Sequence, residues 1–373
     1  MNQPTLLKAS TPLIPPVALL EQLPLDDTAA AFVARTRQEV VDILRGDDDR
    51  LVVVAGPCSI HDPFAAIEYA HRLKLVADQL APDLRIVMRV YCEKPRTTIG
   101  WRGLIHDPNL DGSGAIEDGL FVARKLLLKV LEIGVPSACE FLDPMAAVFI
   151  ADAVTWGSIG ARTSESPIHR QLASELPMPV GFKNGTLGNL QVALDAIVTA
   201  ARPHRFLTLD ALGRAAIVRS SGNADCHLVL RGGQGTTNFD AASVRAAGEA
   251  LVATGLPSRV MIDASHGNSG KDHRRQQSVI RDVAQQVADG EHAIRGIMLE
   301  SFLMEGRRDD GDARLAFGQS ITDPCLGWET TFVLLHELAA AARARRSRAG
   351  RHVVAIRNSS PVAGRRPSLL CAK

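Results

Sequence analysis

The chain has 373 residues, 46% of them hydrophobic, and a formal net charge of +1. A charge so close to zero argues against a global field that attracts nucleic acid or a membrane surface. No apolar run reaches the roughly 18 residues needed to span a bilayer, and the N-terminus lacks the basic start and apolar core of a signal peptide. The six cysteines contain no CxxC pair, so we expect a protein of the reducing cytoplasm rather than a disulfide framework.

Residues 1–50 precede the first predicted strand and form an N-terminal extension too short to be an independent domain. Pro15 and Pro16 open a short helical segment. A second helical pattern runs from about Thr28 to Leu44, and Gly46 stops it.

Eight apolar, strand-like runs follow, mostly separated by stretches long enough for a helix. They are LVVVAGPCS (51–59), RIVMRVY (85–91), SACEFL (137–142), GSIGAR (157–162), PVGFKNG (179–185), HLVLRGG (227–233), RVMIDASH (259–266) and IRGIMLES (294–301). Continuous apolar character is typical of parallel strands that are buried on both faces. The pattern therefore predicts an α/β fold, a (β/α)8 barrel over residues 51–345, with its active site at the carboxyl ends of the strands.

Several helix boundaries can also be read from the sequence. Asp143-Pro144 predicts a helix start ahead of residues 145–156, and Ser166-Pro167 predicts another ahead of 168–176. Residues 116–133 have helical periodicity that ends at Gly134. Residues 206–220 read as two short strands around a turn, which predicts an extra β-hairpin beside the barrel.

Two long loops and a basic tail complete the chain. The loops run from Glu93 to about Ala115 and from Met304 to Gln319, and long loops in a compact domain are usually functional or disordered. The stretch 343–366 contains eight arginines and no acid. We expect residues 346–373 to form a solvated, disordered tail, with a tail that binds a polyanion or a partner as the alternative.

Four residues near the strand ends suit a metal. They are Cys58, His266, Glu300 and Asp323. One thiol, one imidazole and two carboxylates suit a divalent Mn, Fe, Co or Zn ion better than Ca²⁺ or Mg²⁺. Each residue alone has a plainer interpretation, as a packed thiol or a hydrogen-bonded histidine, so the prediction rests on their convergence at one barrel mouth.

Six cations also lie at or just past the strand ends: Arg89, Lys94, Arg96, Arg162, Lys183 and Arg231. Arginine pairs with phosphate or carboxylate through two N–H groups, and lysine supplies a point charge or a proton. Six cations in one cleft would repel each other without bound anions, which indicates a site for more than one anionic group. The alternative is that most of them are scattered surface charges.

Eight motifs surround these residues: GPCSIHDP (56–63), RVYCEKPRTTIGWRG (89–103), EFLDP (140–144), GARTSES (160–166), GFKNGT (181–186), LRGG (230–233), IDASHGNS (262–269) and GQSITDPCLGWE (318–329). They resemble motifs of the metal-dependent 3-deoxy-D-arabino-heptulosonate 7-phosphate (DAHP) synthases, and among them the feedback-regulated type of enteric bacteria and fungi. The resemblance covers about residues 14–345.

The resemblance implies condensation of phosphoenolpyruvate with erythrose 4-phosphate, the first step of the shikimate pathway. It implies that Cys58, His266, Glu300 and Asp323 hold the metal and that Lys94, His266 and Asp323 are catalytic. Phosphoenolpyruvate would be bound by Arg89, Lys94, Glu140, Arg162, Lys183 and Arg231, and the phosphate of erythrose 4-phosphate by Arg96 and Thr97. The six cations and a divalent metal roughly cancel the charges of the two substrates and the ligand set, as a water-poor site requires.

The resemblance also implies a homodimer or homotetramer and an aromatic amino acid as effector. The effector site would involve the N-terminal segment, the hairpin near 206–220 and nearby helices. This chain departs from the usual pattern in TLLKASTPLIPP (5–16) and at Leu176-Pro177-Met178, so the identity of the effector stays open. The segments GQSITDPCLGWE and SFLMEG (301–306) are slightly more similar to tryptophan-sensitive members. Two alternatives stay open. One is a related octulosonate-type synthase, against which KPRTT (94–98) argues, and the other is a non-catalytic barrel paralogue, against which the intact site residues argue.

Overall fold

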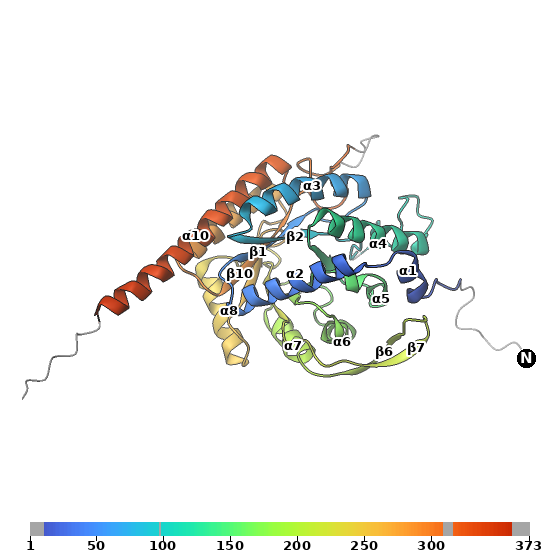
Figure 1. The fold of residues 1–373 in the computed structure, drawn as a ribbon, viewed down its shortest axis with the longest axis horizontal. Coiled ribbons are helices and arrows are strands. Elements are labelled where there is room, and N and C mark those ends of the chain that lie inside the picture. Colours follow the sequence, from blue (N-terminus) through green and yellow to red (C-terminus); the bar gives the residue numbers. More distant parts are fainter. Residues whose placement is uncertain (1–10, 97, 309–315, 360–373) are drawn as a thin grey trace, which may run out of the picture.

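The computed structural model describes residues 11–96, 98–308 and 316–359. Eight parallel strands close into a barrel with helices around it, which confirms the predicted (β/α)8 fold (Figure 1). In order around the barrel they are β1 (Leu51–Gly56), β10 (Ile294–Glu300), β9 (Val260–Asp263), β8 (His227–Leu230), β5 (Val180–Lys183), β4 (Trp156–Ile159), β3 (Ser137–Glu140) and β2 (Leu84–Arg89). Each strand overlaps one of the eight predicted runs; six lie within their run, and β2 and β4 begin one residue before theirs.

The helices are α1 (Pro16–Gln22), α2 (Asp27–Arg45), α3 (Pro63–Leu80), α4 (Ile116–Ile133), α5 (Ala147–Ile150), α6 (Pro167–Glu175), α7 (Gln191–Ala200), α8 (Ala241–Ala253), α9 (Gln276–Ala288) and α10 (Trp328–Ser359), with 3-10 turns at Ala151–Ala153 and His273–Arg275. Aspartates cap three of the helices: the side chains of Asp26, Asp62 and Asp240 accept hydrogen bonds from backbone N–H groups of the first turn. None of the helices in the described ranges has the length and apolar character of a membrane span.

Helix α2 closes one end of the barrel. Its Val40, Ile43 and Leu44 are buried in one cluster with inward-facing strand residues such as Val52 and Trp156. At the same end, the hydroxyl of Thr36 lies 2.9 Å from that of Thr155, which directly precedes β4. The N-terminal extension therefore seals the amino ends of the strands, opposite the end where the site residues gather.

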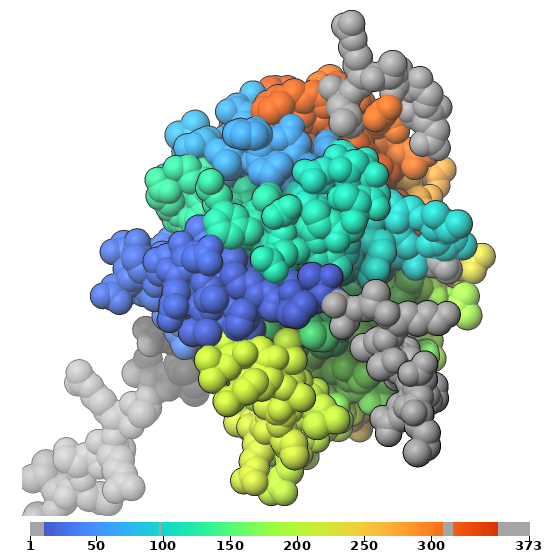
Figure 2. Space-filling model, turned by 90° about the vertical axis from the view of Figure 1, so that its right-hand side faces the viewer, coloured from blue at the N-terminus to red at the C-terminus, as the bar shows by residue number. Residues whose placement is uncertain are grey.

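The hairpin is present as predicted. Strands β6 (Arg205–Leu209) and β7 (Ala215–Arg219) pair antiparallel and form a sheet separate from the barrel. In the space-filling view, the yellow-green region that contains the hairpin protrudes beside the blue N-terminal helices (Figure 2). The backbone N–H of Val17 donates to the carbonyl of Ala211 at the hairpin turn, so the extension and the hairpin are in direct contact.

Two local predictions were wrong. The helix expected over residues 145–156 is only α5 and one 3-10 turn, and β4 already begins at Trp156, the last residue of that stretch. Residues 346–359, expected as disordered tail, continue α10, which projects past the barrel (Figure 1). Arg346 and Arg348 of this helix pair with Asp49 at 2.7 Å and with Asp289 at 2.9 Å. Residues 360–373 lie outside the described residues.

The loop that follows β2 is held against the barrel by close backbone packing. Its Leu104 and Ile105 are buried, and the carbonyl of Ile105 lies where a Cβ on Gly119 of α4 would have to be. At Gly103 φ is +108°, and a Cβ there would lie 2.5 Å from the carbonyl oxygen of Cys92. Glycine is therefore required where the loop returns past the end of β2.

We expect Gly103→Ala to destabilise the protein by about 1–3 kcal/mol more than Gly112→Ala does, because overpacking adds to the backbone strain. Gly112 is the matched control: it lies in the same loop with φ +73°, but a Cβ there would meet nothing within 4 Å. Urea unfolding of both variants measures the difference. Equal unfolding midpoints would show that the loop has room at Gly103.

Candidate active site

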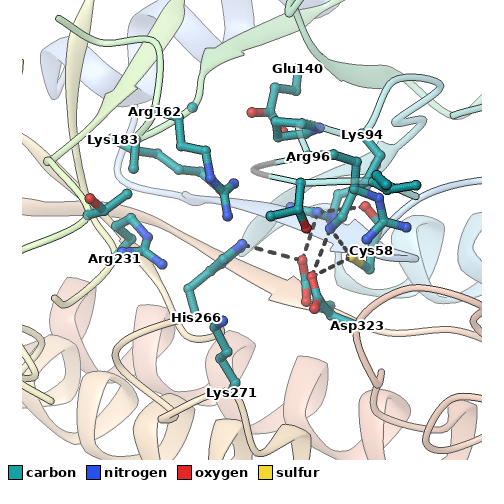
Figure 3. Close-up of a pocket in the computed structure, with 18 residues that line it drawn as sticks. Cys58, Lys94, Arg96, Glu140, Arg162, Lys183, Arg231, His266, Lys271 and Asp323 are labelled. Atoms are coloured by element: carbon teal, nitrogen blue, oxygen red, sulfur yellow. Dashed lines mark hydrogen bonds and ion pairs between the residues drawn. The ribbon is translucent and has the colours of Figure 1, made fainter. Parts of the chain in front are cut away.

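A cavity of about 270 Å³ opens at the carboxyl ends of the barrel strands (Figure 3). Its lining contains every predicted site residue that the structure describes: Cys58, Arg89, Lys94, Arg96, Glu140, Arg162, Lys183, Arg231, His266, Glu300 and Asp323. Thr97 lies outside the described residues. Positions hundreds of residues apart in the chain are thus gathered at one mouth.

The predicted metal ligands form a cluster on one side of the cavity. The ligand atoms of Cys58, Glu300 and Asp323 all lie within 4.8 Å of one another. His266 points its Nε2 at the same group, 3.8 Å from Oε1 of Glu300. A thiol, an imidazole and two carboxylates are a donor set that fits a divalent transition-metal ion.

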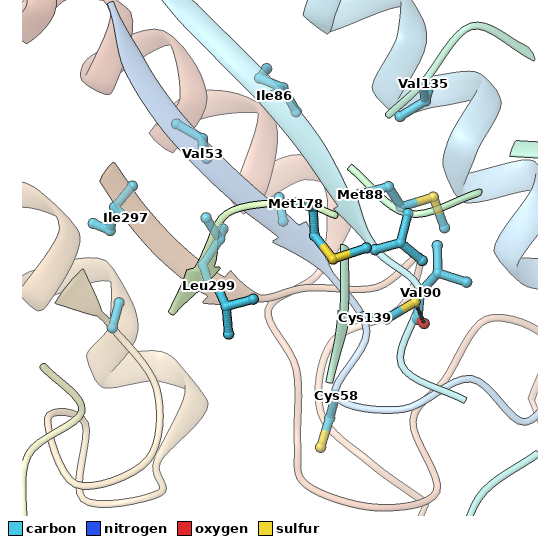
Figure 4. Packing of buried hydrophobic residues seen from close by; sticks show 14 of the residues in the cluster. Val53, Cys58, Ile86, Met88, Val90, Val135, Cys139, Met178, Ile297 and Leu299 are labelled. Atoms are coloured by element: carbon cyan, nitrogen blue, oxygen red, sulfur yellow. Dashed lines mark hydrogen bonds between the residues drawn. The ribbon is translucent and has the colours of Figure 1, made fainter. Parts of the chain in front are cut away.

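Cys58 reaches this cluster from just beyond the end of β1. In Figure 4 its thiol extends away from the packed strand residues Met88, Val90 and Cys139. The side chain is 1% exposed. Burial and the charge of Glu300 raise the pKa of the Cys58 thiol to about 12, against the opposing effect of Lys94.

Lys94 lies beside two of the predicted ligands. Its ammonium is 2.7 Å from Sγ of Cys58 and 2.8 Å from Oδ2 of Asp323. Burial alone would lower the pKa of Lys94, but the neighbouring Cys58, Asp323 and Glu300 outweigh it and raise the pKa. Burial would likewise raise the pKa of Asp323, and the Lys94 ammonium lowers it instead. Both groups therefore carry their charges at neutral pH.

His266 is held in position by its own loop. Its φ of +56° lies in the left-handed region, which residues other than glycine seldom adopt except where the surroundings impose it. The ring Nδ1 lies 2.7 Å from Oγ of Ser265 and 2.9 Å from Oδ2 of Asp263. A carboxylate on one ring nitrogen orients the other nitrogen toward a metal.

The cations line the rest of the cavity. Arg89 is 1% exposed, stacks 4.0 Å over the ring centre of Tyr91 and donates to Oε1 of Glu300 at 3.2 Å. Lys183 is 3% exposed and pairs with Asp263 at 2.9 Å. Arg231 is also buried, whereas Arg96 and Arg162 are exposed at the rim. The arrangement can bind one anion deep in the barrel mouth and a second near the β2–α4 loop.

The sequence interpretation missed Asp263 and Lys271. Asp263 ends β9 and is fully buried, and it contacts both Lys183 and His266. An acid at a strand end three residues before a predicted histidine ligand could have identified it. Lys271 also lines the cavity, points toward His266 in Figure 3 and has a left-handed φ of +64°. The sequence around Lys271 gives no indication of this backbone conformation.

Comparison with known proteins agrees with this geometry. The DAHP synthetase I family profile matches residues 25–336. The chain is 54% identical to the Phe-sensitive phospho-2-dehydro-3-deoxyheptonate aldolase of Escherichia coli K12, over 92% of this chain and 99% of that protein. It is 52% identical to the phospho-2-dehydro-3-deoxyheptonate aldolase of Corynebacterium glutamicum, over 90% and 93% of the two chains.

The fold agrees as well. The solved structure of phospho-2-dehydro-3-deoxyheptonate aldolase from Francisella tularensis superimposes with a TM-score of 0.89 at 46% identity, covering 91% of this chain and 99% of that one. The family profile, which begins at residue 25, includes helix α2 as well as the barrel strands. The chain therefore belongs to the DAHP synthetase I family.

Proposed function

We propose that the chain is a 3-deoxy-7-phosphoheptulonate synthase, which condenses phosphoenolpyruvate with erythrose 4-phosphate and water to DAHP and phosphate. The observation that carries this proposal is one cavity that combines a metal-type ligand cluster with seven lysine and arginine side chains, the six predicted ones and Lys271, in a chain of this family. We also propose that it acts in the cytoplasm, since Cys58, Cys92, Cys139, Cys226 and Cys325 are free thiols.

Cys58, His266, Glu300 and Asp323 would hold a divalent Mn, Fe, Co or Zn ion. When bound, such an ion supplies Lewis-acid chemistry toward the aldehyde of erythrose 4-phosphate. The orientation of His266 by Asp263 supports its role as a ligand.

The cations would bind and orient the substrates. Arg162, Lys183 and Arg231 are suited to the phosphate of phosphoenolpyruvate, and Arg89 and Lys94 to its carboxylate, with Lys183 shared and Glu140 lining the same pocket. Arg96 and Thr97 are suited to the phosphate of erythrose 4-phosphate. Holding the two reactants side by side removes entropy from the barrier, which is worth up to about 7–11 kcal/mol for ideal alignment.

Lys94 is suited to be the proton donor. As carbon 3 of phosphoenolpyruvate attacks the aldehyde carbonyl, the new alkoxide needs a proton, and the Lys94 ammonium lies at the junction of the ligand cluster and the cations. Asp323 holds that ammonium in place. Water then adds at carbon 2, and the hemiketal phosphate collapses by C–O cleavage.

The direct test is a two-substrate assay for phosphate release with each divalent metal added in turn. Activity with erythrose 4-phosphate and none with arabinose 5-phosphate supports the proposal; the opposite preference favours the octulosonate alternative. No phosphate release with any metal, from folded protein, favours the non-catalytic paralogue.

Loss of a residue that hydrogen-bonds to a metal ligand typically lowers metal affinity about 10–100-fold. Cys58→Ser removes the thiolate ligand itself, so it should lower metal affinity by at least that factor. Equilibrium dialysis with metal analysis measures this without relying on turnover. Cys226→Ala is the control, since that buried thiol does not line the cavity. Unchanged metal affinity in Cys58→Ser would remove the thiol from the metal site.

Arg96→Ala should raise the KM for erythrose 4-phosphate about 10–100-fold, because a hydrogen bond between charged groups is worth about 1.5–3 kcal/mol. The KM for phosphoenolpyruvate should change little. Arg102→Ala is the matched control, because Arg102 is exposed in the same loop but does not line the cavity. Steady-state kinetics with each substrate varied in turn separates the two constants, and equal effects on both would contradict the assignment.

We further propose that the protein is a homodimer or homotetramer with an aromatic amino acid as effector. Leu207 and Ile217 lie opposite each other on the hairpin and are 80% and 71% exposed, which supports an apolar contact surface. Sensitivity to phenylalanine and to tryptophan is recorded in the names of two Escherichia coli relatives, at 54% and 50% identity. These identities do not favour tryptophan over phenylalanine as the effector. Adding each aromatic amino acid to the two-substrate assay identifies which one, if any, inhibits.

Leu207→Lys combined with Ile217→Lys should shift the protein toward smaller species, because charges replace the apolar face of the hairpin. Light scattering after size-exclusion chromatography measures the mass. Val252→Lys is the control, since Val252 on α8 is 62% exposed and far along the chain from the hairpin. An unchanged oligomer in the double variant would show that the subunits associate elsewhere.

A further inference from the structure

Two buried titratable side chains lie at the base of the β2–α4 loop and have no part in the chemistry described above. Glu93 directly precedes Lys94 and is 3% exposed, and His106 near the far end of the same loop is 8% exposed. Nε2 of His106 lies 3.7 Å from Oε1 of Glu93. Neither ring nitrogen of His106 has a hydrogen-bond partner among the described residues.

Glu93 also reaches the neighbouring loop of the barrel. Its carboxylate accepts hydrogen bonds from the backbone N–H of Leu142 at 3.2 Å and from that of Asp143 at 3.2 and 3.3 Å. These residues follow Glu140, which lines the cavity. One buried carboxyl group thus connects the loop that carries Lys94 and Arg96 to the loop that follows Glu140 at the end of β3.

The surroundings favour a single proton on this pair. Burial raises the pKa of Glu93 to about 8, opposed by the two backbone N–H groups and reinforced by Asp143 and Glu140. Burial, helped by Arg102, lowers the pKa of His106, against the effect of Asp143. The other titratable groups that face the pair are the buried thiols Cys92 and Cys139. Below about pH 8 the proton therefore resides mainly on Glu93, and His106 is neutral.

Resting on the proposed function, we propose that Glu93 and His106 are positioning residues that share one proton across the base of this loop and thereby hold Lys94 and Arg96 beside Glu140. As a carboxylic acid, Glu93 can donate its O–H to His106 after a small side-chain movement, while its other oxygen accepts the N–H groups of Leu142 and Asp143. When the proton leaves, a buried carboxylate faces a neutral ring, and an unpaired buried charge is costly.

The direction of the pH effect follows from these groups. Because the pKa of Glu93 in the folded protein is raised above its ordinary value, the stabilising contact is present at low and neutral pH and is lost as pH rises through about 8. If only the protonated pair holds the loop, the KM for erythrose 4-phosphate rises about tenfold between pH 7 and 9.

The variant Glu93→Gln tests this, because an amide can accept the same N–H groups and donate to His106 at every pH. We expect the KM for erythrose 4-phosphate of Glu93→Gln to lack the alkaline rise that the unmodified protein shows. Asp118→Asn, which removes an exposed carboxylate at the start of α4, should retain the rise. A parallel rise in Glu93→Gln and in the unmodified protein would overturn the proposal.

A second measurement does not depend on turnover. Arg96 and Arg102 are exposed tryptic sites in the loop, and Arg214 at the hairpin turn provides an internal reference. Cleavage at the loop, relative to Arg214, should increase severalfold between pH 7 and 9 in the unmodified protein and stay level in Glu93→Gln. An unchanged ratio in the unmodified protein would overturn the proposal even if the variant fails to fold. The proteolysis measurement does not involve substrates. It therefore tests the role of Glu93 and His106 even if the chain uses substrates other than those of the proposed function.

Discussion

The buried carboxylate of Asp263 joins the two halves of this site. One of its oxygens lies 2.9 Å from the Lys183 ammonium and 2.9 Å from the His266 ring, and the side chain has no exposed surface. Burial alone would raise the pKa of Asp263, but Lys183 and His266 lower it well below the ordinary value. A lasting negative charge at this point orients the predicted metal ligand and compensates the cation that faces the anion pocket. Without Asp263, neither the His266 ring nor the Lys183 ammonium would have the carboxylate that now holds both of them.

The same balance extends across the cavity. Arg89 contacts Glu300, and Lys94 contacts Cys58 and Asp323, so two of the cations touch residues of the ligand cluster directly. The positions of the ligand-cluster residues and of these cations are therefore coupled, so a charge bound at the ligand cluster changes the electrostatic potential at the cations. This coupling suits a reaction that brings two phosphorylated molecules together, because the repulsion between them must be offset before the carbon atoms can meet.

Sequence alone predicts the eight strands because parallel strands buried on both faces are continuously apolar, and β1 has no exposed residue. It predicts most of the site because strand ends in a closed barrel meet at one mouth. It does not predict the short segment at 145–156, where tertiary spacing overrides a good helix start, or the helical continuation past Arg345, where acids of the barrel compensate the arginines. The pairing of Glu93 with His106 and the contacts of Asp263 depend on burial and distance, which only the folded chain defines.

Helix α2 lies near the N-terminus but packs against strands from both ends of the barrel sequence. It contacts both β1 and β10, and a Cβ on Gly46 at its end would meet the guanidinium of Arg295. During synthesis α2 emerges before any barrel strand, yet the surface that it covers does not exist until the last strand has joined the first. Contacts so distant along the chain slow folding. The apolar face of α2 and the edge of β1 that pairs with β10 therefore stay exposed to solvent until nearly the whole polypeptide has been synthesised.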